Sequence, residues 1–273
     1  MANMRIIYDN AADVAVITAT SSVLPTSNMQ NDYKSSAHRS STTSVTYTLT
    51  WTSAVQIGGV ALPATNLTGD ATIQVKLYTN AGDVTPVATS PVIPACPGAN
   101  LELWNWSMPL NSNAFIFGGA SKSAVWFDNQ VSCKKCEIIL VDTTNLAGYI
   151  DCAKVVAGAY WEPTYNISNG ATVVLTDTSG ATRNDSGDLL CDRGFIHDSL
   201  SFDFSVLLET DKVELLKILR RVGTSRSILV SLAPGENNSI MEQTNTIYGK
   251  RSNSGINTEL FGIYRHSMEL EGW

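Results

Sequence analysis

The fold class of this chain is decided by residues 46–79, which read TYTLTWTSAVQIGGVALPATNLTGDATIQVKLYT. Tyr47, Leu49 and Trp51 alternate with threonines, and the same alternation of apolar and polar residues returns over 73–77. A period of two puts one set of side chains on a buried face and the other toward solvent, which is typical of half-buried antiparallel strands. No catalytic motif interrupts the stretch, so it predicts a β-rich protein that binds or assembles.

The composition agrees with many short strands joined by polar turns. Charged residues make up 16% of the 273 residues, against about 25% in an average globular protein, and Ser, Thr, Asn and Gly fill the difference. Apolar residues make up 44%, which is enough for the cores of one large or two ordinary domains. The net charge of −7 and the pI near 4.9 argue against nucleic acid or an anionic membrane as a partner.

No segment is predicted to cross a membrane or to direct export. A helical span would need a run of about 18 apolar residues, and none occurs. Residues 1–22 carry Arg5, but Asp9, Asn10 and Asp13 break their apolar stretch, so no export signal is predicted. We therefore expect synthesis and folding in the cytosol.

The five cysteines are expected to be reduced thiols in that compartment. Cys96, Cys152 and Cys191 stand alone and are interpreted as small buried apolar residues. Cys133 and Cys136 have the spacing of a metal or redox pair, but no second Cys or His pair follows at zinc-site distance. A structural role is favoured for this pair, with a disulfide in an extracellular particle as the alternative. No metal and no cofactor are predicted.

Two domains are predicted, one over residues 1–161 and one over 162–273. Residues 24–31 are predicted to be a loop, and residues 81–100, with four prolines, an irregular excursion. Strands of the first domain are expected at 5–8, 15–18, 47–51, 57–63, 72–78, 124–127, 136–142 and 149–158. Strands of the second are expected at 172–176, 200–207, 227–232, 245–250 and 263–270.

One helix is predicted over residues 211–222. Asp211 can cap it, Glu214 completes a capping box, and Gly223 supplies the stop at its end. An apolar stripe at helical spacing is formed by Leu215, Ile218, Leu219 and Val222. The second domain is therefore predicted to be a β-sandwich with one helix packed on it.

The order of elements in residues 1–161 resembles the galactose-binding-like jelly roll of the discoidin (coagulation factor C-type) family. The matching order is an early loop with Asn28, then TLTW, IGGVALP, NLTGDATIQVKLY, KKCEIILVD and TTNLAGYIDCAKVVAG. This resemblance implies a discoidin-like sandwich for the first domain.

Nearly the whole chain also resembles uncharacterised tail proteins of tailed bacteriophages and prophages. The matching segments are LPTSNMQND, VALPATNLT, AGYIDCAKVVAGAYWEP, LLCDRG, RRVGTSRSILVSLAPG and IYGKRSNSGI. This resemblance implies a virion component near the end of the tail and not an enzyme. The second half is similar in layout to the β-sandwich-plus-helix unit of tail tubes and distal tail rings, which is an analogy of fold.

Motifs of catalysis are missing from the sequence. The three histidines have no acid or nucleophile at motif spacing, and no HExxH, GxSxG or P-loop occurs. Asp128, Asp142 and Asp151 could be brought together as the carboxylates of a glycosidase. Because any sandwich with 25 acidic residues offers such trios, we expect that the chain is not an enzyme.

Sugar binding is the more serious chemical alternative. Lectin sites on jelly rolls lie on loops at one end and stack an aromatic ring against the apolar face of a sugar. The candidate platform residues are Trp104, Trp106 and Trp126, with Asn105, Arg39 and Asp32 as polar partners. The same tryptophans could fill the core or a subunit interface, where tryptophan is enriched, and that reading is favoured.

One polar turn has the residue types of a calcium site. Asp142, Thr143 and Asn145 could supply oxygen ligands to Ca²⁺. A polar turn between two strands explains the same residues equally well.

The sequence as a whole predicts a structural component of a phage tail tip or distal tail that assembles into a symmetric homo-oligomeric ring. Arg220, Arg221 and Arg226 are the candidate assembly contacts toward an acidic neighbour, with a solvated face as the alternative. Expected partners are further copies and other tail proteins (tube and hub), and the expected location is the virion, after synthesis in the host cytoplasm. The alternative function is a carbohydrate-binding adhesin that recognises a glycan of the host surface.

Overall fold

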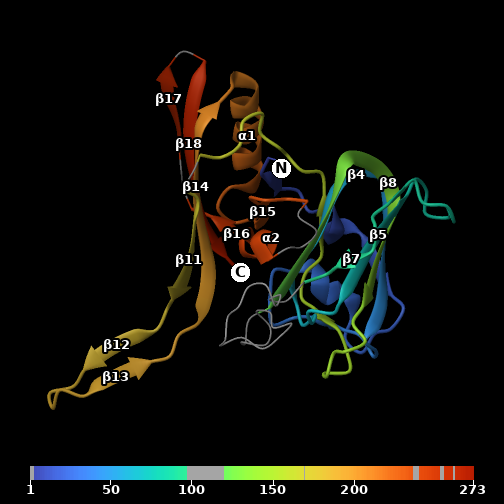
Figure 1. Ribbon diagram of the computed structural model, residues 1–273, viewed down its shortest axis with the longest axis horizontal. Coiled ribbons are helices and arrows are strands. Elements are labelled where there is room, and N and C mark those ends of the chain that lie inside the picture. Colours follow the sequence, from blue (N-terminus) through green and yellow to red (C-terminus); the bar gives the residue numbers. More distant parts are fainter. Residues whose placement is uncertain (1–2, 97–119, 169, 236–239, 253–254, 261) are drawn as a thin grey trace. The chain divides into compact units, whose positions relative to one another are not determined.

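A computed structural model describes residues 3–96, 120–168, 170–235, 240–252, 255–260 and 262–273 (Figure 1). The protein is mainly β, as predicted. Its chain forms two compact units, the first from Met1–Pro163 and Ile228–Thr246 and the second from Thr164–Ser227 and Ile247–Trp273.

The first unit is built almost entirely from strands. These are β1 (Arg5–Ile7), β2 (Val16–Ala19), β3 (His38–Arg39), β4 (Ser44–Thr65), β5 (Thr72–Tyr78), β6 (Ala88–Thr89), β7 (Ile93–Pro94), β8 (Ser121–Val141), β9 (Asp151–Cys152), β10 (Val156–Gly158) and β15 (Ile228–Ser231). Its described helical segments are η1 (Ala11–Val14), η2 (Thr26–Gln30) and α2 (Ile240–Thr244).

The second unit combines strands with one longer helix. Its elements are β11 (Thr172–Asp177), β12 (Gly180–Arg183), β13 (Leu189–Asp192), β14 (Ile196–Leu207), α1 (Glu209–Val222), β17 (Ile256–Leu260) and β18 (Ile263–Gly272), together with most of β16 (Thr246–Arg251).

The main sheet of the first unit has the strand order β3-β9-β4-β8-β5-β6. β2 and β10 also pair with β4, and β7 pairs with β5, so nine strands take part. Every pairing in this sheet is antiparallel. β4 and β8 form the longest ladder of this sheet.

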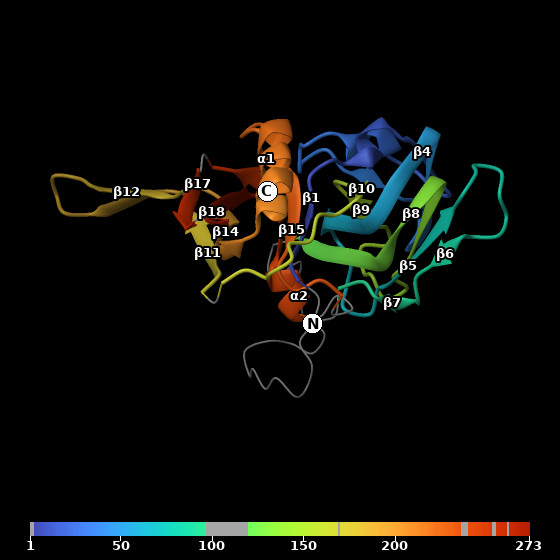
Figure 2. The same cartoon turned by 90° about the horizontal axis from the view of Figure 1, so that it is seen from above.

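β4 and β8 bend together along their ladder. Their register shifts at Thr50/Val55 and again further along the ladder, and such bulges bend a strand pair (Figures 1 and 2). Asp142, just beyond β8, donates its backbone N–H to Thr43 O at 2.8 Å. Its carboxylate accepts the backbone N–H of Thr68 at 2.9 Å. Both ends of β4 therefore meet at one end of the sandwich.

We call this end the loop end and define it as residues 39–43, 66–71 and 142–151. Hydrogen bonds join the three segments, since Asp142 contacts Thr43 and Thr68 and the Ser40 N–H donates to Ile150 O.

The alternation that predicted the strands is confirmed by burial. In the first half of β4, Val45, Tyr47, Leu49 and Trp51 are buried while the residues between them are partly exposed. β5 repeats the pattern. From residue 57 to 65 every residue of β4 is buried, so the alternation ends where both faces of the strand are covered.

Several predicted elements differ in extent from the observed ones. The strands predicted at 124–127 and 136–142 are parts of the single strand β8, and those at 47–51 and 57–63 are parts of β4. Bulges explain this, because they interrupt the sequence pattern without ending the ladder. The segment 24–31 was predicted to be a loop, yet it contains the short helix η2.

The sheet of the second unit runs in the order β16-β18-β14-β11, and β17 also pairs with β18. Buried apolar side chains on this sheet are Leu200, Phe202, Phe204, Leu207, Ile247, Tyr248, Met268 and Leu270. β12 and β13 form a separate two-stranded ribbon that extends from the end of β11 and β14 (Figures 1 and 2).

Helix α1 confirms the predicted helix and its stop but not its cap. Its C-terminal cap is Gly223, at φ 59°, whose N–H donates to Leu219 O at 3.0 Å. The predicted capping box is wrong, because the helix begins at Glu209 and Leu208 occupies the N-cap without a side-chain hydrogen bond. Asp211 instead accepts hydrogen bonds from the N–H and hydroxyl of Thr164.

The same helix buries its predicted apolar stripe and contacts β18. No helix in the described part of the chain has the length and apolar character needed to span a membrane.

The second domain was predicted as the continuous segment 162–273, and the observed units divide the chain differently. Residues 228–246 belong to the first unit because β15 pairs with β1, which aligns Ile6 with Val230. Strand pairing over such a distance leaves no local signal in the sequence.

The cysteines follow the prediction except at one position. Cys96, Cys133, Cys136 and Cys152 are buried free thiols, and burial raises the pKa of Cys133 to about 11 and that of Cys152 to about 12. Cys191 was expected to be buried and is exposed, because the ribbon that carries it has no buried residue.

Candidate functional site

The loop end brings together side chains that are far apart in the sequence. β3 pairs with β9, which sets Arg39 opposite Asp151 across 112 positions of chain. The Ser40 N–H donates to Ile150 O at 2.9 Å and continues that alignment. Antiparallel pairing of two very short strands therefore places a cation beside an anion at the protein surface.

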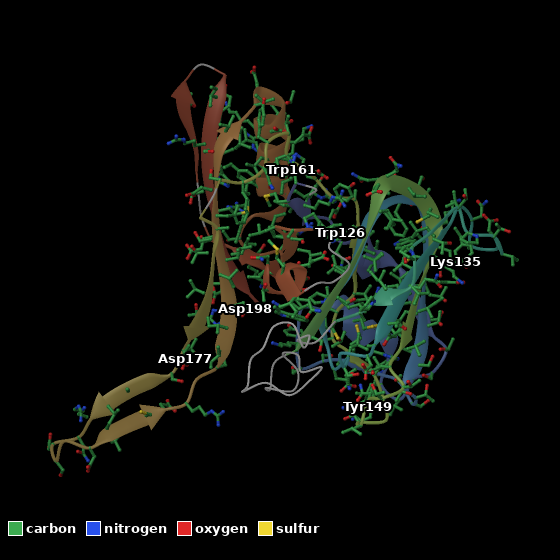
Figure 3. The ribbon with its side chains drawn as sticks, in the orientation of Figure 1. Trp126, Lys135, Tyr149, Trp161, Asp177 and Asp198 are labelled. Atoms are coloured by element: carbon green, nitrogen blue, oxygen red, sulfur yellow. The ribbon has the colours of Figure 1, made fainter. Side chains whose placement is uncertain are left out.

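Arg39, Tyr149 and Asp151 form a compact group that we call the Arg39 site. Arg39 Nε and Nη2 donate to the two carboxylate oxygens of Asp151 at 2.9 and 2.8 Å. The guanidinium carbon lies 3.9 Å from the centre of the Tyr149 ring, which Figure 3 places at the loop end. The Arg39 and Asp151 side chains are 38% and 26% exposed, so solvent reaches both.

The Arg39 site keeps unused hydrogen-bonding capacity. The hydrogen bond to Asp151 raises the pKa of Arg39, so the guanidinium is charged at every physiological pH. Asp151 engages two of its five N–H groups, and within the described residues the other three have no acceptor. The site therefore offers planar donors next to carboxylate acceptors and an aromatic ring.

A buried histidine supports the strand that carries Arg39. His38 is fully buried, and its Nδ1 lies 3.0 Å from the Tyr47 hydroxyl. Burial lowers the pKa of His38, although the nearby Asp151 charge opposes that effect. A neutral imidazole therefore lies directly behind the charged pair.

The polar turn considered for calcium is held by its own hydrogen bonds. Asp142 accepts from the Thr68 N–H, the Thr68 hydroxyl and the Asn145 amide at 2.9, 2.6 and 3.0 Å. Asn145 Oδ1 accepts the Ala147 N–H at 3.0 Å. In the described residues no group of three or more His, Cys, Asp or Glu side chains is placed to hold a metal ion. The turn connects two strands and shapes the loop end.

Trp126, one of the predicted platform residues, lies on β8 away from the loop end (Figure 3). Its indole N–H donates to Glu242 Oε1 at 2.7 Å. Its ring meets Tyr160 edge-on, with ring centres 5.9 Å apart, and lies beneath the Arg5 guanidinium. These contacts give Trp126 a packing role within the first unit, and its part in sugar binding stays a prediction.

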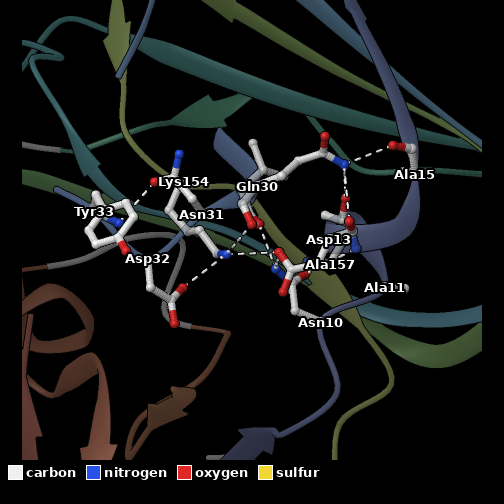
Figure 4. A network of polar contacts seen from close by, with 12 residues as sticks. Asn10, Ala11, Asp13, Ala15, Gln30, Asn31, Asp32, Tyr33, Lys154 and Ala157 are labelled. Atoms are coloured by element: carbon white, nitrogen blue, oxygen red, sulfur yellow. Dashed lines mark hydrogen bonds and ion pairs between the residues drawn. The ribbon is translucent and has the colours of Figure 1, made fainter. Parts of the chain in front are cut away.

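Asp32, a predicted polar partner, belongs to a different network (Figure 4). Lys154 is 1% exposed, and its Nζ lies 2.8 Å from Asp13 Oδ1 and 3.0 Å from Asp32 Oδ1. It also donates to Gln30 O at 3.2 Å. Burial raises the pKa of Asp13, and its hydrogen bond with Lys154 opposes that rise. The network ties η1 and η2 to the segment before β10.

The remaining predicted residues divide between two places. Trp104, Asn105 and Trp106 lie outside the described residues. Arg220, Arg221 and Arg226 lie exposed at and just beyond the C-terminal end of α1.

The carboxylates considered for catalysis are engaged separately. Asp142 is buried in the polar turn, and Asp151 is paired with Arg39. Asp128 lies exposed within β8. Asp142 and Asp151 therefore each accept hydrogen bonds from different partners.

A second cluster of the same chemical types lies elsewhere on the first unit. Lys135 Nζ lies 3.8 Å from the Tyr78 ring centre and 3.5 Å from Glu137. The Tyr78 hydroxyl donates to Glu137 at 2.6 Å, and burial together with this bond raises the pKa of Tyr78 to about 12. This cluster lies on β5 and β8 (Figure 3), which makes it a natural comparison for the Arg39 site.

Sequence reasoning found Arg39 but missed the residues beside it. Tyr149 was predicted only to belong to the strand at 149–158. Asp151 was considered only as one of three possible glycosidase carboxylates. No spacing rule links residue 39 to residue 151, because their proximity depends on the pairing of β3 with β9.

No protein-family model and no curated protein matches the sequence. Solved structures to which part of the chain is similar include carbohydrate-binding modules. One is the module CpGH89CBM32-5 from Clostridium perfringens, in complex with GalNAc-β-1,3-galactose, at 10% identity and a TM-score of 0.38. It covers 55% of this chain and 100% of the module.

Two further similar structures are of the same kind. A chitosan-binding module from a Paenibacillus chitosanase/glucanase has 10% identity and a TM-score of 0.39, covering 55% of this chain and 99% of its own. A family 32 module from C. perfringens, in complex with galactose, has 13% identity and a TM-score of 0.38, covering 56% and 98%.

Proposed function

We propose that the first unit binds a glycan at its loop end, through the Arg39 site. The observation that carries the proposal is the exposed arginine–carboxylate fork, with Arg39 Nη2 2.8 Å from Asp151 Oδ2 and its guanidinium 3.9 Å above the Tyr149 ring. This is the carbohydrate-binding alternative of the sequence analysis, with a different set of residues around Arg39.

The chemistry of the site suits neighbouring sugar hydroxyls. A hydroxyl both donates and accepts, so a ligand with two adjacent hydroxyls can accept from the free N–H groups of Arg39 and donate to Asp151. Hydrogen bonds to charged groups are stronger than neutral ones and are directional. The Tyr149 ring supplies apolar surface for the C–H face of a sugar ring.

The side chains of the Arg39 site are also fixed in place before a ligand binds. Asp151 fixes the guanidinium plane, and its backbone N–H donates to Asn66 Oδ1 at 2.8 Å. Side chains ordered before binding lose less conformational entropy when the ligand arrives, which favours affinity.

The test is a binding measurement on the full chain. The wild-type protein is applied to a glycan array that includes galactose-, N-acetylgalactosamine- and fucose-terminated glycans, and the best ligand is titrated by calorimetry. We expect Arg39→Ala and Asp151→Asn each to weaken binding roughly ten-fold or more, since each removes a hydrogen bond to a charged group and leaves its partner unpaired. Tyr149→Ala should weaken it by a similar factor.

The matched control is the Lys135 cluster, with Lys135→Ala and Tyr78→Phe. These substitutions remove the cation over the Tyr78 ring and the hydroxyl that donates to Glu137, in a cluster of the same residue types on the same unit. They should leave glycan affinity unchanged. Loss of binding in the control variants but not in the Arg39-site variants would place the ligand elsewhere, and Trp126→Ala would then be the next variant. Absence of glycan binding by the wild-type protein contradicts the proposal itself.

A second candidate function is structural, as a component of a phage tail tip that assembles with further copies and with tube and hub proteins. The observation that favours an assembly role is the ribbon of β12 and β13, whose residues are all exposed. We also propose that the chain is not an enzyme. Release of reducing sugar ends from a bound glycan, lost on Asp128→Asn or Asp142→Asn, would contradict that.

A further inference from the structure

The ribbon of the second unit exposes apolar side chains on both of its faces. We call residues 177–193 the arm, which contains β12 and β13. All strand residues of β12 and β13 are exposed, and within β13 Leu189 and Leu190 are 55% and 56% exposed. Successive strand residues point to opposite faces, so neither face of the arm packs against a core.

The exposed apolar surface continues onto the strands at the base of the arm. The positions from 173 to 196 hold seven of the twenty exposed large hydrophobic residues of the described chain. These are Val173, Val174, Leu175, Leu189, Leu190, Phe195 and Ile196. A two-stranded ribbon is only marginally stable by itself, and a large exposed apolar patch marks an interaction site.

The charges of the arm complement another exposed part of the same unit. The arm contains Asp177, Asp185, Asp188 and Asp192 against Arg183 and Arg193, so its net charge is 2 − 4 = −2. Residues 215–226 contain four basic residues and no acidic one, and Lys217 among them is paired with Glu214. Three of those basic residues are the exposed arginines at the end of α1.

The arm does not reach those arginines within its own unit. In two views at right angles it extends from β11 and β14 away from α1 (Figures 1 and 2). The turn at its tip is held by hydrogen bonds within the arm. Arg183 donates to Gly187 O at 2.8 Å, and the Asn184 amide donates to Asp188 at 3.1 Å. The acidic, apolar arm and the basic helix end are therefore two different surfaces of one chain.

We propose that the arm binds a second copy of this chain, at the arginine-rich end of α1. The contact pairs Asp185 and Asp188 of one copy with Arg220, Arg221 and Arg226 of the next, and it covers Leu189 and Leu190. Because the two surfaces differ, the contact is head-to-tail and generates a ring if the rotation closes, or a filament if it does not. Opposite net charges steer the encounter, and the apolar side chains supply the buried area.

The first test is self-association of the full chain, measured by light scattering and native mass spectrometry over a concentration series. We expect oligomers at low salt that weaken at about 0.5 M salt, because salt screens exposed charges. Asp185→Lys with Asp188→Lys should weaken association roughly ten-fold or more, as should Arg220→Glu with Arg221→Glu. Combining all four substitutions should restore association to near the wild-type value, since the pairing is reversed and not removed.

The second test uses Cys191 as a built-in probe of the arm. It is the exposed cysteine among five, and the other four are buried. In the variant Thr224→Cys, mild oxidation should give covalent dimers and longer chains between Cys191 of one copy and position 224 of the next. Val84→Cys, at a position 91% exposed in the first unit, is the matched control and should not cross-link.

Three outcomes would overturn the proposal. One is a chain that stays monomeric at every concentration and salt. Another is an oligomer that neither charge reversal weakens. The third is cross-linking through position 84 as efficient as through position 224, which would show random collision. Glycan binding by the Arg39 site is measured separately, so either proposal can fail without the other.

Discussion

Lys154 is a buried lysine of the first unit, with 1% of its side chain exposed, and its surroundings explain why the fold retains it. Its ammonium group lies between two carboxylates and a backbone carbonyl, so each of its three N–H groups has an acceptor. Asp13 and Asp32 are 41% and 35% exposed, which keeps their outer oxygens in water. A buried charge with such partners costs little, whereas removing it leaves the carboxylates unpaired.

We expect Lys154→Met to destabilise the protein by about 3 kcal/mol, near the lower end for a broken buried pair. Urea unfolding of the full chain measures it. Lys217→Met is the control, because Lys217 forms an exposed i,i+3 pair with Glu214 of the kind worth about 0.5 kcal/mol. Adding Asp13→Asn and Asp32→Asn to Lys154→Met should recover part of the loss. Equal unfolding midpoints for both lysine variants would show that the network is not stabilising.

Two buried histidines make stability depend on pH. Burial lowers the pKa of His38 and of His266 below the ordinary 6.5. The unfolded chain therefore binds protons before the folded one does. Stability should fall as the pH drops below about 6.5 and level off below the folded pKa values.

Thermal unfolding between pH 8 and pH 5 tests this. The double variant His38→Gln, His266→Gln should show a flatter pH dependence than either single variant. An unchanged slope in the double variant would mean that other groups carry the dependence.

At the scale of elements, two adjacent glycines of β4 leave room for aromatic rings to pack directly against the strand backbone. A Cβ at Gly58 would lie 2.5 Å from the Tyr160 ring, and one at Gly59 would lie 2.6 Å from the Trp126 ring. Both distances are shorter than van der Waals contact permits. The GG pair therefore allows the two aromatic rings to pack closely against β4.

Gly59→Ala should destabilise the first unit by roughly 1–3 kcal/mol, as overpacking does. Gly82→Ala is the matched control, since a Cβ there meets nothing within 4 Å. Chemical denaturation gives both values, with Trp fluorescence as the probe of the Trp126 environment. A Gly59→Ala variant as stable as Gly82→Ala would show that the aromatic rings move aside at no cost.

At the scale of the whole molecule, the first unit is assembled from two separate stretches of chain. β15 supplies a hydrogen-bonded partner to β1, and α2 supplies Glu242 to the Trp126 indole. A fragment that ends at residue 163 would lose both and expose an edge strand, which is a site of aggregation.

We therefore expect the fragment 1–163 to melt lower, by roughly 10 °C or more, than the same fragment joined through a Gly/Ser linker to residues 228–246. Thermal unfolding followed by circular dichroism gives the melting temperature of each fragment. Identical melting temperatures would mean that the segment 228–246 does not stabilise the first unit.

The sequence by itself determined those features that depend on neighbours along the chain. The alternation around Tyr47 and Leu49 predicts the buried faces, because side chains of a strand alternate between its two sides. The apolar stripe from Leu215 to Val222 and Gly223 after it predict helix α1 and its end. Burial of Cys96 and Cys152 was also predicted, because isolated cysteines usually pack as small apolar residues.

Tertiary structure alone decided which distant residues meet. Asp211 accepts from Thr164 instead of capping its helix, β15 joins the first unit, and Cys191 is exposed on the arm. The Arg39 site exists only because β3 pairs with β9 and so aligns Arg39 with Asp151. Local patterns encode which face of an element is apolar, but contacts between distant elements depend on the packing of the whole unit, which no spacing along the chain records.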